Sequence, residues 1–212
     1  MSLFSSNRSS GQHGNRERES RHSSGWTHLQ KHLASHESLR ILDIGPTSAI
    51  NINYVTSLGH SIYMANLVDE AAKPEWKIAD DSTEGARFDV DGFLATNLNF
   101  SDRKFDVVTF WDTADYLDPG VLKPVIDRIH EVMQPGGLLL AFFHAKATGA
   151  GVDTAFSRYH LTATDAVEIQ RSGNHPLLST WNNRQIEKLL SNFSGYKFFL
   201  AKDNLSEVIA TR

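Results

Sequence analysis

Hydrophobic residues follow two different spacings along the chain, and the change from one to the other marks the predicted elements. Four short apolar runs have the length and composition of strands buried on both faces. These runs span residues 39–44, 61–65, 105–110 and 138–143. Over 50–58 and 119–133, apolar residues instead recur about every 3.6 positions, as on helices with one buried face. The alternation predicts an α/β fold in which helices cover a mostly parallel sheet, with the strand at 39–44 near its centre.

The last part of the chain predicts a helix followed by an antiparallel hairpin. The helix covers 184–193, and the hairpin strands at 196–200 and 207–210 are separated by the polar residues 202–204. A further strand is expected at 93–95. Together, these elements predict a Rossmann-like three-layer sandwich with a seven-strand, mostly parallel sheet and an antiparallel terminal hairpin.

The start of the chain differs from the rest because residues 1–24 carry almost no apolar side chains after Phe4. Such a segment cannot bury enough surface to offset the entropy lost on ordering. We therefore predict a disordered tail over 1–24 and one domain over 25–212. Arginines make the tail mildly basic, which leaves RNA or partner binding as an alternative to a solvated tail.

A short helix is expected at 26–35, where Trp26, Leu29 and Leu33 have helical spacing. Histidines recur at every fourth position from 28 to 36, a spacing that would suit a metal-binding helix face. No carboxylate or thiolate accompanies them at ligand spacing, so a polar outer face is favoured and no metal site is predicted.

Composition narrows the classes of function. The chain has 212 residues, 40% of them hydrophobic, which favours one domain with a sizeable core. Its net charge of −4 and the absence of a long single-sign run give no indication of a nucleic-acid partner. The absence of cysteine excludes disulfides, thiolate zinc sites and cysteine nucleophiles, and it fits a cytoplasmic protein. No run of about 18 apolar residues occurs, so a soluble, untargeted protein without a membrane span is expected.

The strand at 39–44 ends in a tight turn at Gly45 and Pro46, just before the helix at 50–58. A parallel strand that enters a glycine turn brings backbone N–H groups and the positive end of a helix to one point, where a polar or anionic ligand can dock. The strand at 61–65 delivers Asn66 to the same edge of the sheet. This edge is therefore the predicted ligand site.

Three stretches resemble class I S-adenosylmethionine-dependent methyltransferases. Asp43-Ile44-Gly45 resembles the start of the family's glycine-rich loop, Asp or Glu-x-Gly-x-Gly-x-Gly, with Thr47 and Ala49 at the later glycine positions. Residues 98–108, Leu-Asn-Phe-Ser-Asp-Arg-Lys-Phe-Asp-Val-Val, resemble the family's Leu-Pro-Phe-x-Asp-x-x-Phe-Asp-x-Val. Gln134-Pro135-Gly136-Gly137, placed before an apolar strand, resembles its Leu-x-Pro-Gly-Gly.

The resemblance covers roughly residues 39–212 and implies S-adenosyl-L-methionine as cofactor at the carboxyl ends of the strands. Asn66 stands where the family places an acid on the ribose hydroxyls, and Thr96 and Asn97 stand where it presents an acid to the adenine. The implied cofactor-binding residues are Asp43, Gly45, Pro46, Thr47, Asn66, Thr96, Asn97, Trp111 and Asp112.

Methyl transfer depends on positioning and, where a proton must leave the acceptor, on a base. Candidates for a base or an acceptor-orienting group, each with a packed structural role as the alternative, are Asp112, His144, Tyr159 and His160. The long polar stretch 145–182 is interpreted as the cover of an acceptor pocket. Asp112-Thr113-Ala114-Asp115 differs from the Asn or Asp-Pro-Pro-aromatic motif of enzymes that methylate exocyclic amines of nucleobases, which counts against nucleobase N-methylation.

The leading hypothesis is methyl transfer from S-adenosylmethionine to a small molecule. The alternative is a methyltransferase-like binding or regulatory module without catalysis, which the altered positions Thr47, Ala49, Asn66 and Asn97 favour. A nicotinamide oxidoreductase is disfavoured by the same glycine losses and by the terminal hairpin, because the methyltransferase fold inserts its last, antiparallel strand between the fifth and sixth strands. The sequence specifies neither the acceptor nor the oligomeric state.

Overall fold

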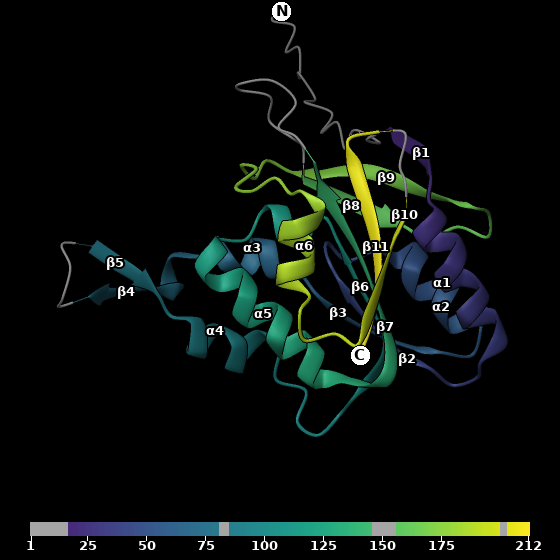
Figure 1. Ribbon diagram of the computed structural model, residues 1–212, viewed down its shortest axis with the longest axis horizontal. Helices are drawn as coiled ribbons and strands as arrows, with labels where there is room; N and C mark the ends of the chain where they lie inside the picture. The colour runs from purple at the N-terminus through teal and green to yellow at the C-terminus, as the bar shows by residue number, and fades with distance from the viewer. Residues whose placement is uncertain (1–16, 81–84, 146–155, 200–202) are drawn as a thin grey trace, which may run out of the picture.

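The computed structural model describes residues 17–80, 85–145, 156–199 and 203–212. Figure 1 shows a central sheet with helices on both sides and a second, smaller sheet across one end. Within the described residues, no helix is long and apolar enough to cross a membrane.

The central sheet contains six of the described strands, in the order β10-β11-β7-β6-β2-β3. They are β2 (Arg40–Ile44), β3 (Ser61–Ala65), β6 (Phe105–Trp111), β7 (Met133–His144), β10 (Gly195–Phe199) and β11 (Leu205–Thr211). β3, β2, β6 and β7 are parallel, whereas β11 runs antiparallel between β7 and β10. The α/β class and the inserted antiparallel strand are confirmed, and the sheet has six described strands where seven were expected.

The prediction of a strand at 93–95 is wrong, because these residues belong to helix α4 (Val90–Asn97). Asp89 caps this helix by accepting a hydrogen bond from the backbone N–H of Gly92 at 3.1 Å. The fully buried Phe93 packs on Trp76 and Phe88 at ring distances of 5.3 Å. β3 is therefore an edge strand, and β2 lies one place from the edge rather than at the centre.

The segment between β3 and α4 leaves the sheet. It contains helix α3 (Leu67–Ala71), the 3₁₀ turn η1 (Pro74–Trp76) and a hairpin of β4 (Lys77–Asp80) and β5 (Gly85–Phe88). The hairpin projects from the body of the molecule in Figure 1. Its two strands form a separate sheet and do not join the central one.

Alternate residues of the central strands enter two different cores. On one face, Ile41 and Leu140 pack with Trp26, Leu29 and Val55 of helices α1 (Ser24–Ser35) and α2 (Ala49–Ser57). The other face packs on α3, α4, α5 (Pro119–Val132) and α6 (Asn183–Leu189). The helix expected at 26–35 is thus confirmed, and it covers one face of the sheet.

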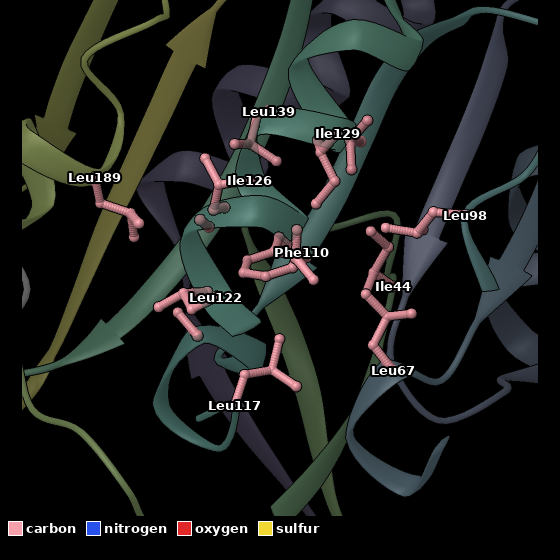
Figure 2. Close-up of a cluster of buried hydrophobic side chains, with 14 of the residues drawn as sticks. Ile44, Leu67, Leu98, Phe110, Leu117, Leu122, Ile126, Ile129, Leu139 and Leu189 are labelled. Atoms are coloured by element: carbon pink, nitrogen blue, oxygen red, sulfur yellow. The ribbon is translucent and has the colours of Figure 1, made fainter. Parts of the chain in front are cut away.

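Figure 2 shows the larger core, where Ile44, Phe110 and Leu139 of the sheet meet Leu122 and Ile126 of α5. All five side chains are at most 2% exposed. Burial of a large apolar side chain contributes about 1.5–3 kcal/mol, so this core holds the carboxyl ends of β2 and β6 in fixed relative positions.

The smaller sheet is antiparallel and joins the start of the chain to the stretch expected to cover the acceptor pocket. Its order is β1 (Arg18–His22), β9 (Ala166–Gly173), β8 (Phe156–His160). The predicted tail boundary at residue 24 is therefore wrong, because 18–22 form a strand and Ser24 begins α1. Residues 1–16 and 146–155 lie outside the described part of the chain.

Candidate active site

A cavity of about 470 Å³ lies where β6 and β7 end beneath the smaller sheet. Its lining combines residues that follow β6 or end β7 with residues of β1, β8, β9 and the start of β11. The lining residues are Glu19, Ser20, Arg21, Asp112, His144, Ser157, Tyr159, Ile169, Asp203, Asn204 and Leu205. Ligands of open α/β sheets bind at this edge of the sheet. Three of the four predicted catalytic candidates, Asp112, His144 and Tyr159, line the cavity.

Asp112 directly follows β6 and is 2% exposed. Its Oδ2 accepts a hydrogen bond of 3.0 Å from the hydroxyl of Tyr159, whereas its Oδ1 has no partner among the described residues. Burial, and then the charge of Asp115, raise the pKa of Asp112 to about 7. Burial and the neighbouring Asp112 also raise the pKa of Tyr159 well above its usual value, so the phenol stays a hydrogen-bond donor.

Asp115 lies in the 3₁₀ turn η2 (Thr113–Asp115) and fixes His144, the last residue of β7. Its carboxylate accepts from Nδ1 of His144 at 2.6 Å and from the backbone N–H of His144 at 3.2 Å. Burial lowers the pKa of His144, but the hydrogen bond to Asp115 and the charges of the nearby carboxylates together outweigh it, and the pKa is raised. Burial raises the pKa of Asp115, and its bonds with His144 oppose that shift.

Arg21 of β1 lines the cavity but is engaged by two acids. Its Nε donates to Asp203 at 2.7 Å, Nη1 donates to Glu207, and Nη2 donates to the carbonyl of Leu205 at 3.2 Å. Burial lowers the pKa of Arg21, but the hydrogen bonds to Asp203 and Glu207 outweigh it and raise the pKa. Glu207 is 2% exposed and also accepts from the hydroxyl of Ser23 at 2.9 Å. The charge of Arg21 is thus matched within the protein.

The turn at Gly45 and Pro46 is covered by Trp111. The N–H of Gly45 donates to the carbonyl of Ala65 at 2.9 Å, and Pro46 has no N–H. A Cβ on Gly45 would lie 3.2 Å from Cδ1 of Trp111. Trp111 has a φ of 47°, and its ring stacks on Tyr159 at 4.9 Å. The indole of Trp111 therefore covers the turn at Gly45.

Asp43 joins three elements. Its carboxylate accepts from the hydroxyl of Thr109 at 2.6 Å, from Nε1 of Trp111 at 2.7 Å and from Nδ2 of Asn51 at 2.9 Å. Burial raises the pKa of Asp43, and these three bonds oppose the shift. The predicted cofactor residues Asp43 and Trp111 are brought together, bonded to each other.

His160 is the catalytic candidate that does not line the cavity. Its Nδ1 lies 2.7 Å from the hydroxyl of Ser48, the cap of α2, and its Nε2 lies 3.1 Å from Oε1 of Gln170. Burial lowers the pKa of His160. The side chain therefore ties β8 to the start of α2 as a neutral ring.

The remaining predicted cofactor residues do not converge. Asn66 caps α3 by accepting from the N–H of Asp69 at 3.3 Å. Asn97 lies on α4 and donates to the carbonyl of Phe93 at 3.0 Å, and Thr96 is exposed on the same helix. Because the strand that was to end at Thr96 and Asn97 is a helix, that basis for an adenine contact is wrong. Thr47 is exposed before α2.

A second cavity, of about 730 Å³, lies between α3 and the connection from β6 to α5. α3 follows β3 and this connection follows β6, and these two strands flank β2 in the sheet. The lining residues are Val68, Ala71, Ala72, Lys77, Phe88, Tyr116, Asp118, Val121, His175, Pro176 and Leu178. Apolar walls with a few polar groups at a topological switch point fit a nucleoside-sized group.

Sequence reasoning missed both Arg21 and Asp115 as members of the site. Arg21 falls within the predicted tail, and the pairing of β1 with β9, together with its bonds to Asp203 and buried Glu207, brings it to the cavity. Asp115 belongs to the Asp112-Thr113-Ala114-Asp115 stretch, and its spacing of three from Asp112 in a turn after a strand is the sequence signal that indicates a role for it.

Comparisons with known proteins give one family match and several structural ones. Residues 42–141 match a family model described as a methyltransferase domain. An S-adenosylmethionine-dependent methyltransferase structure from Methanosarcina mazei has 15% identity and a TM-score of 0.51, covering 86% of this chain and 96% of that one. TehB from Haemophilus influenzae has 12% identity and a TM-score of 0.49, with 88% and 62% covered. No curated protein matches the chain significantly.

A third structure is the 1,6-didemethyltoxoflavin-N1-methyltransferase of Burkholderia thailandensis, solved with 1,6-didemethyltoxoflavin and S-adenosylhomocysteine. It has 14% identity and a TM-score of 0.45, with 88% of this chain and 75% of that one covered. At 15% identity and a TM-score of 0.51, the likeness to the Methanosarcina mazei structure concerns the fold alone.

Proposed function

We propose that this chain, which has the fold of class I S-adenosylmethionine-dependent methyltransferases and matches a methyltransferase domain over residues 42–141, transfers a methyl group to a small-molecule acceptor. The observation that carries the proposal is Asp112, which follows β6 at the carboxyl edge of the sheet. Asp112 lines the 470 Å³ cavity, and one buried oxygen of its carboxyl has no partner among the described residues.

The cofactor is assigned to the 730 Å³ cavity, which lies within the range of about 300–1,000 Å³ typical of small-molecule sites. Val68, Ala71, Phe88 and Tyr116 would enclose its adenosyl part, and Asp118 offers a carboxylate at the wall. When bound, S-adenosylmethionine supplies a methyl group on a sulfonium, whose carbon–sulfur bond breaks with its electron pair remaining on sulfur.

The residues of the smaller cavity have distinct tasks in this proposal. Asp112 receives a proton from the acceptor, and a pKa of about 7 suits a base that works near neutral pH. The hydroxyl of Tyr159 holds Oδ2 of Asp112, which leaves Oδ1 for the acceptor. Asp115 holds His144 at the end of β7, where its ring forms part of the wall. β8 and β9, within the stretch 145–182, close the cavity over the acceptor.

Calorimetric titration with S-adenosylhomocysteine tests the cofactor assignment. Ala71→Phe places a ring in the larger cavity and should weaken binding at least tenfold while the circular dichroism spectrum is retained. Ala95→Phe makes the same change at an exposed site of α4 and should leave the affinity unchanged. Equal affinities of the two variants would contradict the assignment, and no binding to the wild type would contradict the proposed function.

The second candidate function, a binding module without catalysis, is favoured by one observation. The N–H of Gly45 donates to the carbonyl of Ala65, and Trp111 covers the turn. The turn therefore has fewer free hydrogen-bond donors and less open surface for a ligand than an uncovered glycine turn. Labelled methyl transfer separates the two candidates. If the protein binds S-adenosylhomocysteine but releases no labelled product from S-adenosylmethionine with any acceptor offered, the module is the better description.

A further inference from the structure

Among the described residues that line the 470 Å³ cavity, acidic side chains outnumber basic ones. Three carboxylates, those of Glu19, Asp112 and Asp203, line it, against Arg21 and His144. Two further carboxylates lie directly behind the lining, because Asp115 bonds His144 and Glu207 bonds Arg21. The described residues in and behind the lining therefore carry an excess of negative charge.

Both basic side chains of the lining are already neutralised by acids. Arg21 donates to Asp203 and Glu207, and its side chain is 10% exposed. His144 gives Nδ1 to Asp115, which is fully buried. An anionic ligand would meet no unmatched cation among the lining residues that the structure describes, and it would be repelled by Asp112 and Glu19.

The side-chain oxygen left without a partner is a hydrogen-bond acceptor. Oδ1 of Asp112 is buried and unpaired among the described residues, and an unpaired buried carboxylate oxygen destabilises the protein. A ligand that donates a hydrogen bond and carries positive charge would satisfy the oxygen and offset the charge of Asp112 together. A neutral hydroxyl would satisfy the oxygen without offsetting the charge. A carboxylate would neither donate a hydrogen bond to the oxygen nor offset the charge.

We propose, on the basis of the proposed function, that the acceptor is a small amine that enters this cavity as a cation and binds with its ammonium group on Asp112. The ammonium proton then moves from nitrogen to Oδ1 of Asp112, which leaves a lone pair on nitrogen. That pair forms the new bond to the methyl carbon of S-adenosylmethionine as the carbon–sulfur bond breaks and sulfur keeps the electron pair. The product is a methylated ammonium ion and protonated Asp112, which releases its proton to solvent.

Matched probes that differ in the charge of one end, or of both ends, test this proposal. One series is tyramine, its alcohol tyrosol and the acid 4-hydroxyphenylacetate, and a second is putrescine, 1,4-butanediol and succinate. Dissociation constants are measured at pH 8 by calorimetry, with and without S-adenosylhomocysteine. The amine of at least one series should bind at least tenfold more tightly than its alcohol, and the acids should not bind.

Two variants locate the effect. Asp112→Asn keeps the side-chain shape and removes the charge, and it should reduce the preference for the amine over the alcohol at least tenfold. Asp102→Asn makes the same change in net charge at an exposed site and should leave the preference unchanged. When the wild-type protein is incubated with a bound amine and S-adenosylmethionine labelled in its methyl group, the label should appear on the nitrogen of the amine.

Three outcomes would overturn the proposal: an alcohol or acid that binds as tightly as its amine, an amine preference that survives Asp112→Asn, or no amine binding in either series. Each is distinguishable from failure of the proposed function. In that case the protein would not bind S-adenosylhomocysteine, whereas the probe titrations without it would still report the charge preference of the cavity.

Discussion

The hydroxyl of Tyr159, on β8, donates a 3.0 Å hydrogen bond to the carboxyl of Asp112, which follows β6. The bond joins the smaller sheet to the carboxyl edge of the central sheet at the point where the cavity opens. Tyr159 also stacks on Trp111 with the two rings 5° from parallel. One side chain therefore both orients the candidate base and covers the residue that fills the glycine turn.

Tyr159→Phe should preserve the stacked ring and remove the hydrogen bond. Because Asp112 is buried, the loss should lower the free energy of unfolding by about 1–3 kcal/mol at pH 8. The loss should be smaller at pH 5, where the carboxyl is protonated. Urea denaturation at both values measures it, with the exposed Tyr196→Phe as control. Equal losses at pH 5 and pH 8 would contradict the charge state assigned to Asp112.

Asp112→Asn should make the protein more stable at neutral pH. Burial raises the pKa of Asp112 from 3.8 to about 7, so the folded state holds this proton more tightly than the unfolded state. The stability that follows is fully present below about pH 4 and is lost as the pH rises through 7. The advantage of Asp112→Asn over the wild type should therefore grow from pH 4 to 7.5, by on the order of 3 kcal/mol. Denaturant titrations across that range test it, and a constant difference would contradict it.

Arg21→Gln should be costly although the residue lies near the start of the chain. The change leaves Glu207, 2% exposed, without its cationic partner, and breaking a buried ion pair costs about 3–5 kcal/mol. Arg18→Gln is the control on the same strand, because Arg18 and Glu168 form an exposed pair with side chains 44% and 37% accessible. That variant should lose less than about 1 kcal/mol. Similar losses in the two variants would mean that β1 does not dock as described.

Gly45→Ala should destabilise the protein because the new methyl group would lie 3.2 Å from Cδ1 of Trp111. Overpacking of this kind costs about 1–3 kcal/mol, and Gly45→Val should cost more than Gly45→Ala. Gly195→Ala is the control, since no atom lies within 4 Å of its added carbon. Thermal unfolding compares the three variants. An unchanged midpoint for Gly45→Ala would show that Trp111 can leave the turn without loss.

The central sheet could be predicted because its strands at 39–44, 61–65, 105–110 and 138–143 are short, mostly apolar runs, the pattern of strands covered by helices. The run at 93–95 is too short for periodicity to separate strand from helix. In the structure, Asp89 accepts a hydrogen bond from the N–H of Gly92 and so caps a helix that contains this run. β1 escaped prediction because its side chains are mostly exposed. Its pairing with β9 depends on backbone hydrogen bonds, which no side-chain pattern reports.

The site was predictable where it depends on strand ends and not where it depends on distant contacts. Asp112, His144 and Tyr159 line one cavity, as expected of groups at the carboxyl edge. Asp43 and Trp111 were also placed there, but the left-handed backbone of Trp111, with a φ of 47°, turns its indole onto Asp43. The sequence does not report such a dihedral angle, so the filled turn could not be foreseen.

The pairing of β1 with β9 bears on how the protein is made. His22 pairs with Ala166, so β1 has no partner until the ribosome has added 144 further residues. At about 5–20 residues per second, that wait is roughly 7–30 s. An apolar strand left unpaired for so long would invite association with other chains, whereas Arg18, Glu19 and Arg21 make β1 a charged one. The charged side chains that make β1 difficult to recognise as a strand in the sequence thus disfavour association of the nascent chain with other chains until β9 is available to pair with β1.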